Sequence, residues 1–250
     1  MIELKEVSVK NGKEEAARKV SARLVNGRVY GIVSERTGDG ARLLGAMAGA
    51  IPYAGQIKIN GYDLRKQPKK ARACLGYLPE GAPVYGSLTA VEALETVAAA
   101  KGIAYERAIR RIHEILGLTG LEEIKNKQAS SMEEVDRRLL SIAQAMMGDG
   151  DVLLLTDPLK GLTEREAEEV ADVLAELKKN RTLFVCSDAM EGLPENIDTF
   201  LLLRDGELIE SPDAELLEPL RKRRADAPSD RRASRKPRTD GEYEVIGEDE

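Results

Sequence analysis

Short apolar runs alternate with helical patterns along most of this chain, and this alternation limits the folds that it can adopt. The runs Val152–Leu155 and Phe200–Leu203 are continuously apolar, which is typical of strands that are covered on both faces. Between such runs, apolar residues recur at helical spacing. The sequence therefore predicts an α/β architecture. The expected strands are Ile2–Val9, Val29–Val33, Gln56–Ile59, Val152–Leu155, Thr182–Cys186 and Thr199–Leu203.

Two stretches carry the clearest helical pattern. Between Leu88 and Gln144 there is little strand signal, and apolar residues follow a spacing of three and four. We expect a helical subdomain here, inserted at about residues 85–148. The stretch Glu164–Lys179 has one apolar stripe, with acidic residues near its start and lysines at its end, which suits the helix dipole. It is predicted to be a helix packed on the surface of the core.

Composition and charge restrict the classes of function. With 250 residues, 42% of them hydrophobic, the chain can bury a sizeable core, and we expect one large domain over residues 1–218. The net charge of -6 argues against a nucleic-acid binder driven by overall charge, and we expect no specific nucleic acid. No run approaches the ~20 apolar residues of a membrane-spanning helix, so membrane contact is expected through a partner. A single histidine, His113, and two cysteines, Cys74 and Cys186, predict no metal site and reduced thiols.

Residues 219–250 differ from the rest in composition. They are rich in charge, proline and serine and poor in apolar residues, which predicts a disordered tail. The basic half, Arg221–Arg238, precedes an acidic end, Glu242–Glu250. We interpret the tail as solvated. The alternative is a basic arm that contacts anionic lipid headgroups or RNA, since each lysine or arginine near an anionic membrane adds about 1 kcal/mol.

The segment Val29–Gly49 has the hydrophobic outline of a phosphate-binding strand, loop and helix, yet it lacks the residues that hold phosphate. A loop of the form G-x-x-x-x-G-K-[ST] uses glycines for close backbone approach, a lysine for the β- and γ-phosphates and a hydroxyl for magnesium. The corresponding positions here are Ser34, Asp39, Gly40 and Ala41.

The acidic residue in this loop has the wrong charge for a phosphate site. A carboxylate at Asp39 would repel a triphosphate where a helix N-terminus should attract it. We expect Asp39 to N-cap a helix that begins near Gly40 and to satisfy the amides that phosphate normally satisfies. The nearest cation, Arg42, lies two residues further, about 200° around a helix, and should point away. The sequence predicts a nucleotide-independent loop, which also contains Thr37 and Gly38.

Five segments follow one another in an order and spacing that carry a family resemblance: IELKEVSV, GQIKINGYDL, LGYLPEGAPVYGSLTAVEAL, SIAQAMMGDGDVLLLTDPLKGL and FLLLRDGELIE. Together they resemble the nucleotide-binding domain of ATP-binding cassette (ABC) transporters, over about residues 1–210. The resemblance is greatest to subunits that serve separate membrane permeases. It implies a P-loop NTPase-like core with a mainly parallel sheet, an N-terminal antiparallel β portion and an inserted helical subdomain.

Every position that touches nucleotide in that family is altered in this chain. The aromatic residue that stacks on adenine corresponds to Asn11, and the glutamine that bridges magnesium corresponds to Glu80. The magnesium-linked aspartate corresponds to Thr156, and the glutamate that activates water to Asp157. Asp157 has a shorter side chain than glutamate, which withdraws its carboxylate from a general-base position. The switch histidine corresponds to Asp188, which cannot donate a hydrogen bond to phosphate at neutral pH.

The family signature, LSGGQ, corresponds to Met132–Asp136, which reads MEEVD. This segment lacks the serine and both glycines, and it adds acids where the γ-phosphate of the partner subunit's nucleotide would dock. It also fits an ordinary helix start, with Ser130 or Ser131 as the cap and Glu133 or Glu134 in the first turn, and we prefer that interpretation. The signature positions are Met132, Glu133, Glu134, Val135 and Asp136.

The resemblance implies that two cassettes join head to tail, so that the phosphate loop of one chain and the signature of the other form each site. Neither a homodimer of this chain nor a heterodimer with an intact ABC ATPase subunit would then have a complete site. We expect a pseudo-ATPase, with no intact catalytic residue and no resident metal, that couples to or regulates a membrane permease through the surface around Tyr77–Leu94. The resemblance places such a subunit in the cytoplasm, at the inner face of the cell membrane.

Two alternatives stay open at this point. The chain could be a weakly active transporter subunit that binds ATP and Mg²⁺, with Asp157 as the base and Glu80 as a metal ligand. It could also be a soluble interaction module that uses its basic tail.

Overall fold

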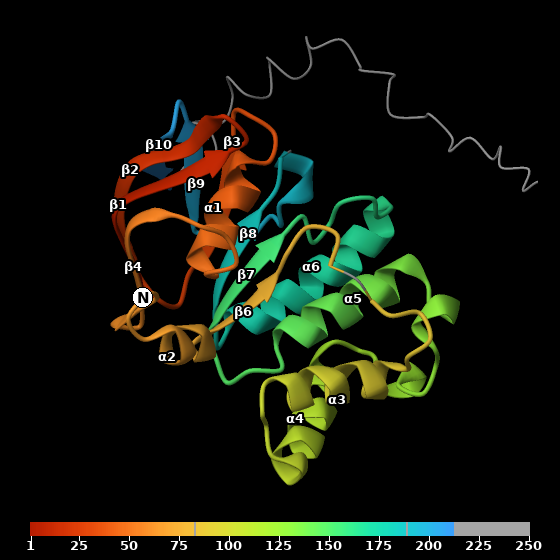
Figure 1. The fold of residues 1–250 in the computed structure, drawn as a ribbon. Coiled ribbons are helices and arrows are strands. Elements are labelled where there is room, and N and C mark those ends of the chain that lie inside the picture. The colour runs from red at the N-terminus through yellow and green to blue at the C-terminus, as the bar shows by residue number, and fades with distance from the viewer. Residues whose placement is uncertain (83, 189, 213–250) are drawn as a thin grey trace, which may run out of the picture.

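The computed structural model describes residues 1–82, 84–188 and 190–212, which fold into two β-sheets with helices around them (Figure 1). The strands are β1 (Ile2–Asn11), β2 (Glu14–Leu24), β3 (Val29–Ser34), β4 (Ala54–Ile59), β5 (Tyr62–Asp63), β6 (Leu75–Leu78), β7 (Val152–Thr156), β8 (Thr182–Cys186), β9 (Thr199–Arg204) and β10 (Glu207–Ser211). The helices are α1 (Asp39–Met47), α2 (Pro68–Ala73), α3 (Ala90–Ala100), α4 (Tyr105–Leu118), α5 (Glu134–Ala145) and α6 (Glu164–Lys178). Short 3-10 helices lie at η1 (Glu122–Ile124), η2 (Ala129–Ser131) and η3 (Met190–Gly192).

The two sheets differ in strand direction. The N-terminal sheet is antiparallel, in the order β2-β1-β4-β5. The larger sheet has the order β10-β9-β3-β8-β7-β6 and is parallel except at its β10–β9 edge. This arrangement confirms the predicted α/β fold, with a mainly parallel sheet and an antiparallel N-terminal portion.

The parallel sheet is covered on both faces, as its continuously apolar strands predict. Tyr30 and Ile32 of β3 pack in a cluster with α1 and the antiparallel sheet, and the ring of Tyr30 stacks on that of Phe184 with 4.6 Å between centroids. Val29 and Val33, on the opposite face of the same strand, pack in a second cluster with α3, α4, α5 and α6. Alternate residues of β3 therefore pack against the elements on the two opposite faces of the parallel sheet.

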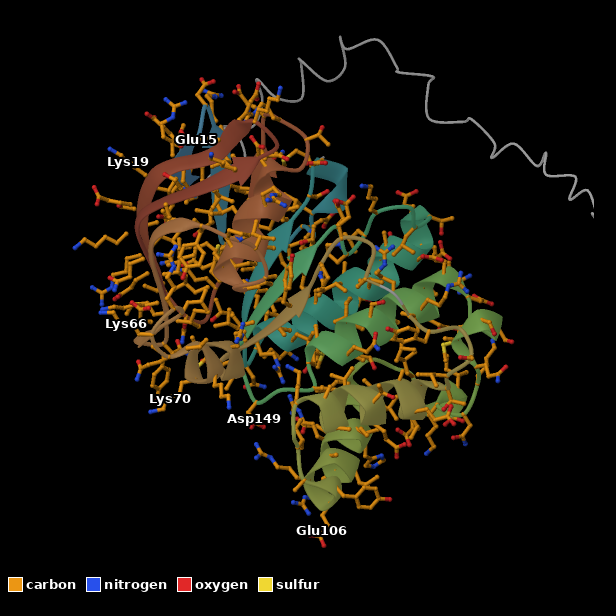
Figure 2. The ribbon with its side chains drawn as sticks, in the orientation of Figure 1. Glu15, Lys19, Lys66, Lys70, Glu106 and Asp149 are labelled. Carbon is orange, nitrogen blue, oxygen red and sulfur yellow. The ribbon has the colours of Figure 1, made fainter. Side chains whose placement is uncertain are left out.

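The helices α3, α4 and α5 lie between β6 and β7 along the chain, within the expected helical insertion. The limits of that insertion, residues 85–148, stay a prediction. Figure 2 shows Glu106 of α4 at the tip of this helical part, at the far end of the molecule from Glu15 and Lys19 of β2. In the part of the chain that the structure describes, each helix is too short or too polar to cross a membrane. The predicted tail, residues 219–250, lies outside the described residues.

Several elements were not predicted. The strand β2 reads EEAARKVSARL, and only scattered positions such as Ala17, Val20 and Leu24 are buried, so its charged residues hide the strand pattern. The strands β5 and β6 and the helix α2 span two, four and six residues, which is too short for a periodic pattern. The strand β10 lies at the edge of the parallel sheet and is half-exposed.

Candidate functional site

The loop that corresponds to a phosphate-binding loop joins β3 to α1 at the carboxyl end of the parallel sheet, where ligands of such sheets bind. The helix α1 begins at Asp39 itself, and its N-cap is Gly38, which has a φ of 82°. No side chain caps the helix. The prediction that Asp39 N-caps a helix beginning near Gly40 is therefore wrong, because the helix starts one residue earlier on a glycine in the left-handed region.

The carboxylate of Asp39 is held by side chains and not by loop amides. It is 3% exposed, and its Oδ1 accepts a hydrogen bond from Asn11 Nδ2 at 2.8 Å. Its Oδ2 accepts from Arg36 Nε at 2.9 Å. Arg36 in turn pairs with Glu14 and donates to the carbonyl of Glu15 at 2.6 Å. The expectation that Asp39 satisfies the amides is also wrong, since its two carboxylate oxygens accept from Asn11 and Arg36 instead.

Other oxygen atoms of the chain accept from the loop amides. The N–H of Gly38 donates to Asp188 Oδ1 at 2.9 Å, across 150 residues of sequence. The N–H of Gly40 donates to Ser34 Oγ at 3.3 Å, and that hydroxyl donates to the carbonyl of Arg36 at 2.8 Å. The structure thus brings the predicted positions Ser34, Gly38 and Asp188 together around one loop.

At Gly40, the position of the phosphate-binding lysine, neighbouring side chains occupy the space that a side chain would need. A Cβ built on Gly40 would lie 2.6 Å from Cys186 Sγ and 3.3 Å from Ile32 Cγ2. Burial raises the pKa of the Cys186 thiol far above its usual range, so this group stays neutral. Sequence reasoning missed this contact because Gly40 and Cys186 lie far apart along the chain.

The remaining loop positions point elsewhere. The side chain of Arg42 donates from Nε to the carbonyl of Lys10 in β1 at 2.9 Å, away from the loop. Thr37 is exposed, and its carbonyl accepts from Asn11 Nδ2 at 3.4 Å. Ala41, in the place of the magnesium-binding hydroxyl, is half-buried. A cavity of about 350 Å³ beside this loop is lined by Leu203, two arginines and five acids, namely Arg18, Arg36, Glu14, Glu15, Glu35, Asp39 and Asp205.

A second group of predicted residues meets at the end of β7. Asp157 is 7% exposed and has a φ of 48°, and its Oδ1 accepts from Ser187 Oγ at 2.8 Å. Lys160 Nζ lies 2.8 Å from Glu80 Oε1 and 3.5 Å from Asp157 Oδ2. Hydrogen bonding to Glu80 raises the pKa of Lys160 above its usual range. Sequence reasoning placed Glu80 and Asp157 in one site but missed Lys160 between them.

A side chain of α5 forms hydrogen bonds with the backbone around Asp157. Arg138 donates from one guanidinium nitrogen to the carbonyls of Asp157 and Pro158, at 2.7 and 2.8 Å. Its other terminal nitrogen donates to the carbonyl of Lys160 at 3.0 Å. Thr156, at the position of the magnesium-linked aspartate, is buried at the end of β7. Nothing in the sequence pattern had singled out Arg138.

The segment at the signature position forms a helix start. The helix α5 begins at Glu134, and the N–H of the N-cap residue Glu133 donates to Asp136 Oδ2 at 3.4 Å. The expectation that Ser130 or Ser131 caps the helix is wrong, because both lie in η2 and the chain then runs extended through the next residues. The place of Glu134 in the first turn is confirmed. Met132 and Val135 are buried in the core.

A cavity of about 410 Å³ lies where these parts meet. It is lined by the end of β6 and the residues after it, by one face of α5, and by the end of β7 and the residues after it. The charged groups that face it are Glu80, Glu134, Asp157, Arg137, Arg138 and Lys160. Among the described residues, no group of three His, Cys, Asp or Glu side chains could hold a metal ion.

The comparison with protein families decides where this fold belongs. A family model described as ABC transporter matches residues 17–160, more than half of the chain. The chain belongs to the ABC transporter family. It is 26% identical to the ABC transporter ATP-binding protein NatA of Bacillus subtilis over 198 residues, which is 78% of this chain and 80% of NatA. It is 27% identical to the ABC transporter ced-7 of Caenorhabditis elegans over 199 residues, which is 79% of this chain but only 12% of ced-7.

Solved structures show the same fold. A dimeric bacterial ABC transporter cassette superposes with a TM-score of 0.72 at 20% identity, covering 85% of this chain and 98% of the other. The structure of cbiO1 from Clostridium perfringens, part of an ABC transporter complex, superposes with a TM-score of 0.74 at 18% identity, covering 90% and 93%. The chain therefore has the fold of an ABC transporter cassette.

Proposed function

We propose that this chain is a non-catalytic cassette subunit, a pseudo-ATPase, that couples to or regulates a membrane permease. The observation that carries the proposal is the state of the start of α1 and of the loop before it. Asp39 is buried there between Asn11 and Arg36, while Asp188 accepts the hydrogen bond that the Gly38 N–H would offer to a phosphate. Oxygen atoms of Asp188 and Ser34 thus accept hydrogen bonds from the loop N–H groups that would donate to a phosphate in a phosphate-binding loop.

The residues present do not fit ATP with Mg²⁺. A triphosphate needs a cation and free amides at this loop, and magnesium needs a hydroxyl or carboxylate oxygen beside them. The loop supplies a buried carboxylate, a glycine with no room for a side chain and an alanine. The neighbouring cavity carries five carboxylates against two guanidinium groups, so it would repel phosphate.

A weakly active ATPase is less well supported. Its general base would be Asp157, whose carboxylate contacts Ser187 and Lys160. A base must reach the attacking water at hydrogen-bond distance, and these contacts hold the Asp157 carboxylate toward protein groups. The further candidate, an interaction module that acts through the basic tail or an anionic lipid contact of residues 221–238, concerns a part of the chain outside the described residues and stays a prediction.

The proposed permease contact uses the junction between the parallel sheet and the helical insertion. A cleft of about 250 Å³ lies there, lined by Tyr77 and Leu78 of β6 and by Val97 of α3, with residues of α5 on its other side. Four of its lining residues, Tyr77, Leu78, Pro79 and Ala82, belong to the predicted contact region, Tyr77–Leu94. Such a subunit would lie in the cytoplasm, at the inner face of the membrane, as a homodimer or as a heterodimer with another cassette. The similarity to NatA, an ABC transporter ATP-binding protein, supports a role as a transporter subunit.

Two measurements test the proposal. Isothermal titration calorimetry of the full chain with MgATP should show no binding at micromolar concentrations, with an intact ABC cassette as the positive control. Purification from native-host membranes under mild detergent should recover a polytopic membrane protein with the chain. Magnesium-dependent micromolar binding would overturn the pseudo-ATPase assignment, and recovery of the chain only as a free species would overturn the permease assignment.

A further inference from the structure

A lysine at the end of β7 joins two parts of the molecule that are distant in sequence. Lys160 Nζ lies 2.8 Å from Glu80 Oε1, in the segment that follows β6 and leads toward the helical insertion. The same nitrogen lies 3.5 Å from Asp157 Oδ2, at the end of the central strand β7. The side chains of Lys160 and Glu80 are half-exposed, whereas that of Asp157 is 8% exposed.

We infer that Lys160 is a built-in cation that fastens the segment after β6 to the end of β7. It thereby holds the approach to the helical insertion in place without a bound ligand. This inference goes beyond the proposed function, because it concerns the free chain and holds whether or not a permease is its partner.

The core side of this contact is prearranged. The N–H of Asp157 donates to the carbonyl of Cys186 at 2.7 Å, and the carboxylate of Asp157 accepts from Ser187. The N–H of Lys160 donates to the carbonyl of Asp157 at 3.2 Å, and Arg138 donates to the carbonyls of both residues. Because the backbone beneath Lys160 is fixed in this way, Lys160 loses only side-chain freedom on binding Glu80.

The other side of the contact is a turn. The N–H of Ala82 donates to the carbonyl of Pro79 at 3.3 Å, and Gly81 has a φ of 64°. Glu80 lies within this turn and extends its carboxylate to Lys160. A turn of this kind can open locally at little cost, so a single ion pair can decide how often it opens.

Among the charged side chains around the cavity of about 410 Å³, Lys160 is the partner of Glu80 and Asp157. Three acids and three basic side chains line that cavity. Arg137 pairs with Glu134 at 2.7 Å, and Arg138 donates to backbone carbonyls. Lys160 is the basic group in contact with Glu80 and Asp157, so its removal would leave two carboxylates facing one another.

The test is amide hydrogen exchange, followed by mass spectrometry, in the full chain and its variant Lys160→Met. Methionine keeps the length of the stem and removes the charge. We expect exchange in peptides covering residues 79–82 to become about threefold to fivefold faster, the size of an exposed ion pair, with an unchanged urea midpoint. Lys160→Arg should restore slow exchange, because it restores the positive charge.

Further variants separate a specific contact from a general charge effect. The matched control is Lys179→Met, which removes an exposed lysine from its ion pair with Glu176 at the end of α6. It should leave residues 79–82 unchanged. Glu80→Gln should accelerate exchange less than Lys160→Met, because it leaves no second carboxylate facing Asp157, and the double variant should exchange no faster than Lys160→Met. Unchanged exchange in Lys160→Met, or equal acceleration in Lys179→Met, would overturn the inference.

Discussion

Two helices of this protein begin in different ways. At the start of α6, the N–H of Thr163 donates to Glu166 Oε2 at 2.8 Å, and the N–H of Glu166 donates to Thr163 Oγ1 at 3.4 Å. This capping box lies within four residues. At the start of α1, Gly38 has no side-chain cap, and its N–H donates to Asp188, 150 residues further along the chain.

The difference follows from where each helix begins. A helix on the surface can be closed by its own residues. The start of α1 lies at the carboxyl end of a parallel sheet, where a phosphate-binding loop leaves its amides open to an anion. Here the closure comes from neighbouring elements, through Asn11 of β1 and Asp188 after β8. The start of α6 is therefore stabilised by residues next to it in sequence, whereas the start of α1 is stabilised by residues that only the folded chain brings near.

The largest expected effect comes from restoring the phosphate-loop lysine. In Gly40→Lys, the new Cβ would lie 2.6 Å from Cys186 Sγ, and both residues are buried. We expect the free energy of unfolding to fall by about 2–3 kcal/mol because the core is overpacked. Urea denaturation measures this loss. Calorimetry should still detect no MgATP binding, because Asp39 remains.

Two comparisons make this result specific. The neighbouring change Ala41→Ser adds the other missing group at a half-buried position and should cost less than about 0.5 kcal/mol. Adding Cys186→Ala to Gly40→Lys should recover part of the loss, since it removes the sulfur atom in contact. A Gly40→Lys variant with full stability and MgATP binding would show that the start of α1 is still open to a ligand.

A smaller effect is expected when the carboxylate at the start of α1 is removed. Asp39→Ala takes the acceptor away from Asn11 and Arg36, and we expect a loss of about 2 kcal/mol in urea denaturation. Arg36 is 42% exposed, so solvent compensates part of its lost ion pair and limits the effect. The control Asp172→Ala removes an exposed carboxylate from α6 and should change stability by less than about 0.5 kcal/mol. Equal losses in the two variants would remove the distinction between the two helices.

The same contrast explains what the sequence could predict. The helix α6 was predicted over Glu164–Lys179 and ends one residue earlier, because its stripe and its charges are local signals. The strand β8 was predicted with its observed limits, Thr182–Cys186, because its run of residues is buried on both faces. The family was also predicted correctly, and the helices α3, α4 and α5 lie in the stretch where helices were expected.

What was missed depends on contacts between distant segments. The altered loop positions could be found by comparison with a phosphate-loop pattern, but their partners could not. Cys186 fills the place beside Gly40, and Lys160 joins Glu80 to Asp157, only because parallel strands bring their carboxyl ends together. The cap at Asp39 was wrong for a related reason, since Gly38 can adopt the backbone conformation that moves the helix start by one residue.

The smallest expected effect tests the local side of the comparison. Thr163→Ala removes the hydroxyl that caps α6, and we expect a loss of about 1 kcal/mol at pH 7. Thr163→Ser keeps the hydroxyl and should retain most of the stability. Thermal melts of the three proteins under one buffer condition measure the difference. A loss in Thr163→Ala as large as in Asp39→Ala would mean that α6 depends on its cap as strongly as α1 depends on its remote contacts.

The capping box also gives α6 a pH dependence of known direction. Hydrogen bonds from the backbone N–H and the hydroxyl of Thr163 lower the pKa of Glu166 below its usual range. A carboxylate with a lowered pKa in the folded state stabilises that state above its usual pKa, about pH 4, and this contribution disappears as the pH falls through the lowered value. The Tm of Glu166→Gln should therefore lie below that of the wild type at pH 7 and approach it at pH 3.5. A gap of the same size at both pH values would show that the ionised carboxylate does not contribute to the start of α6.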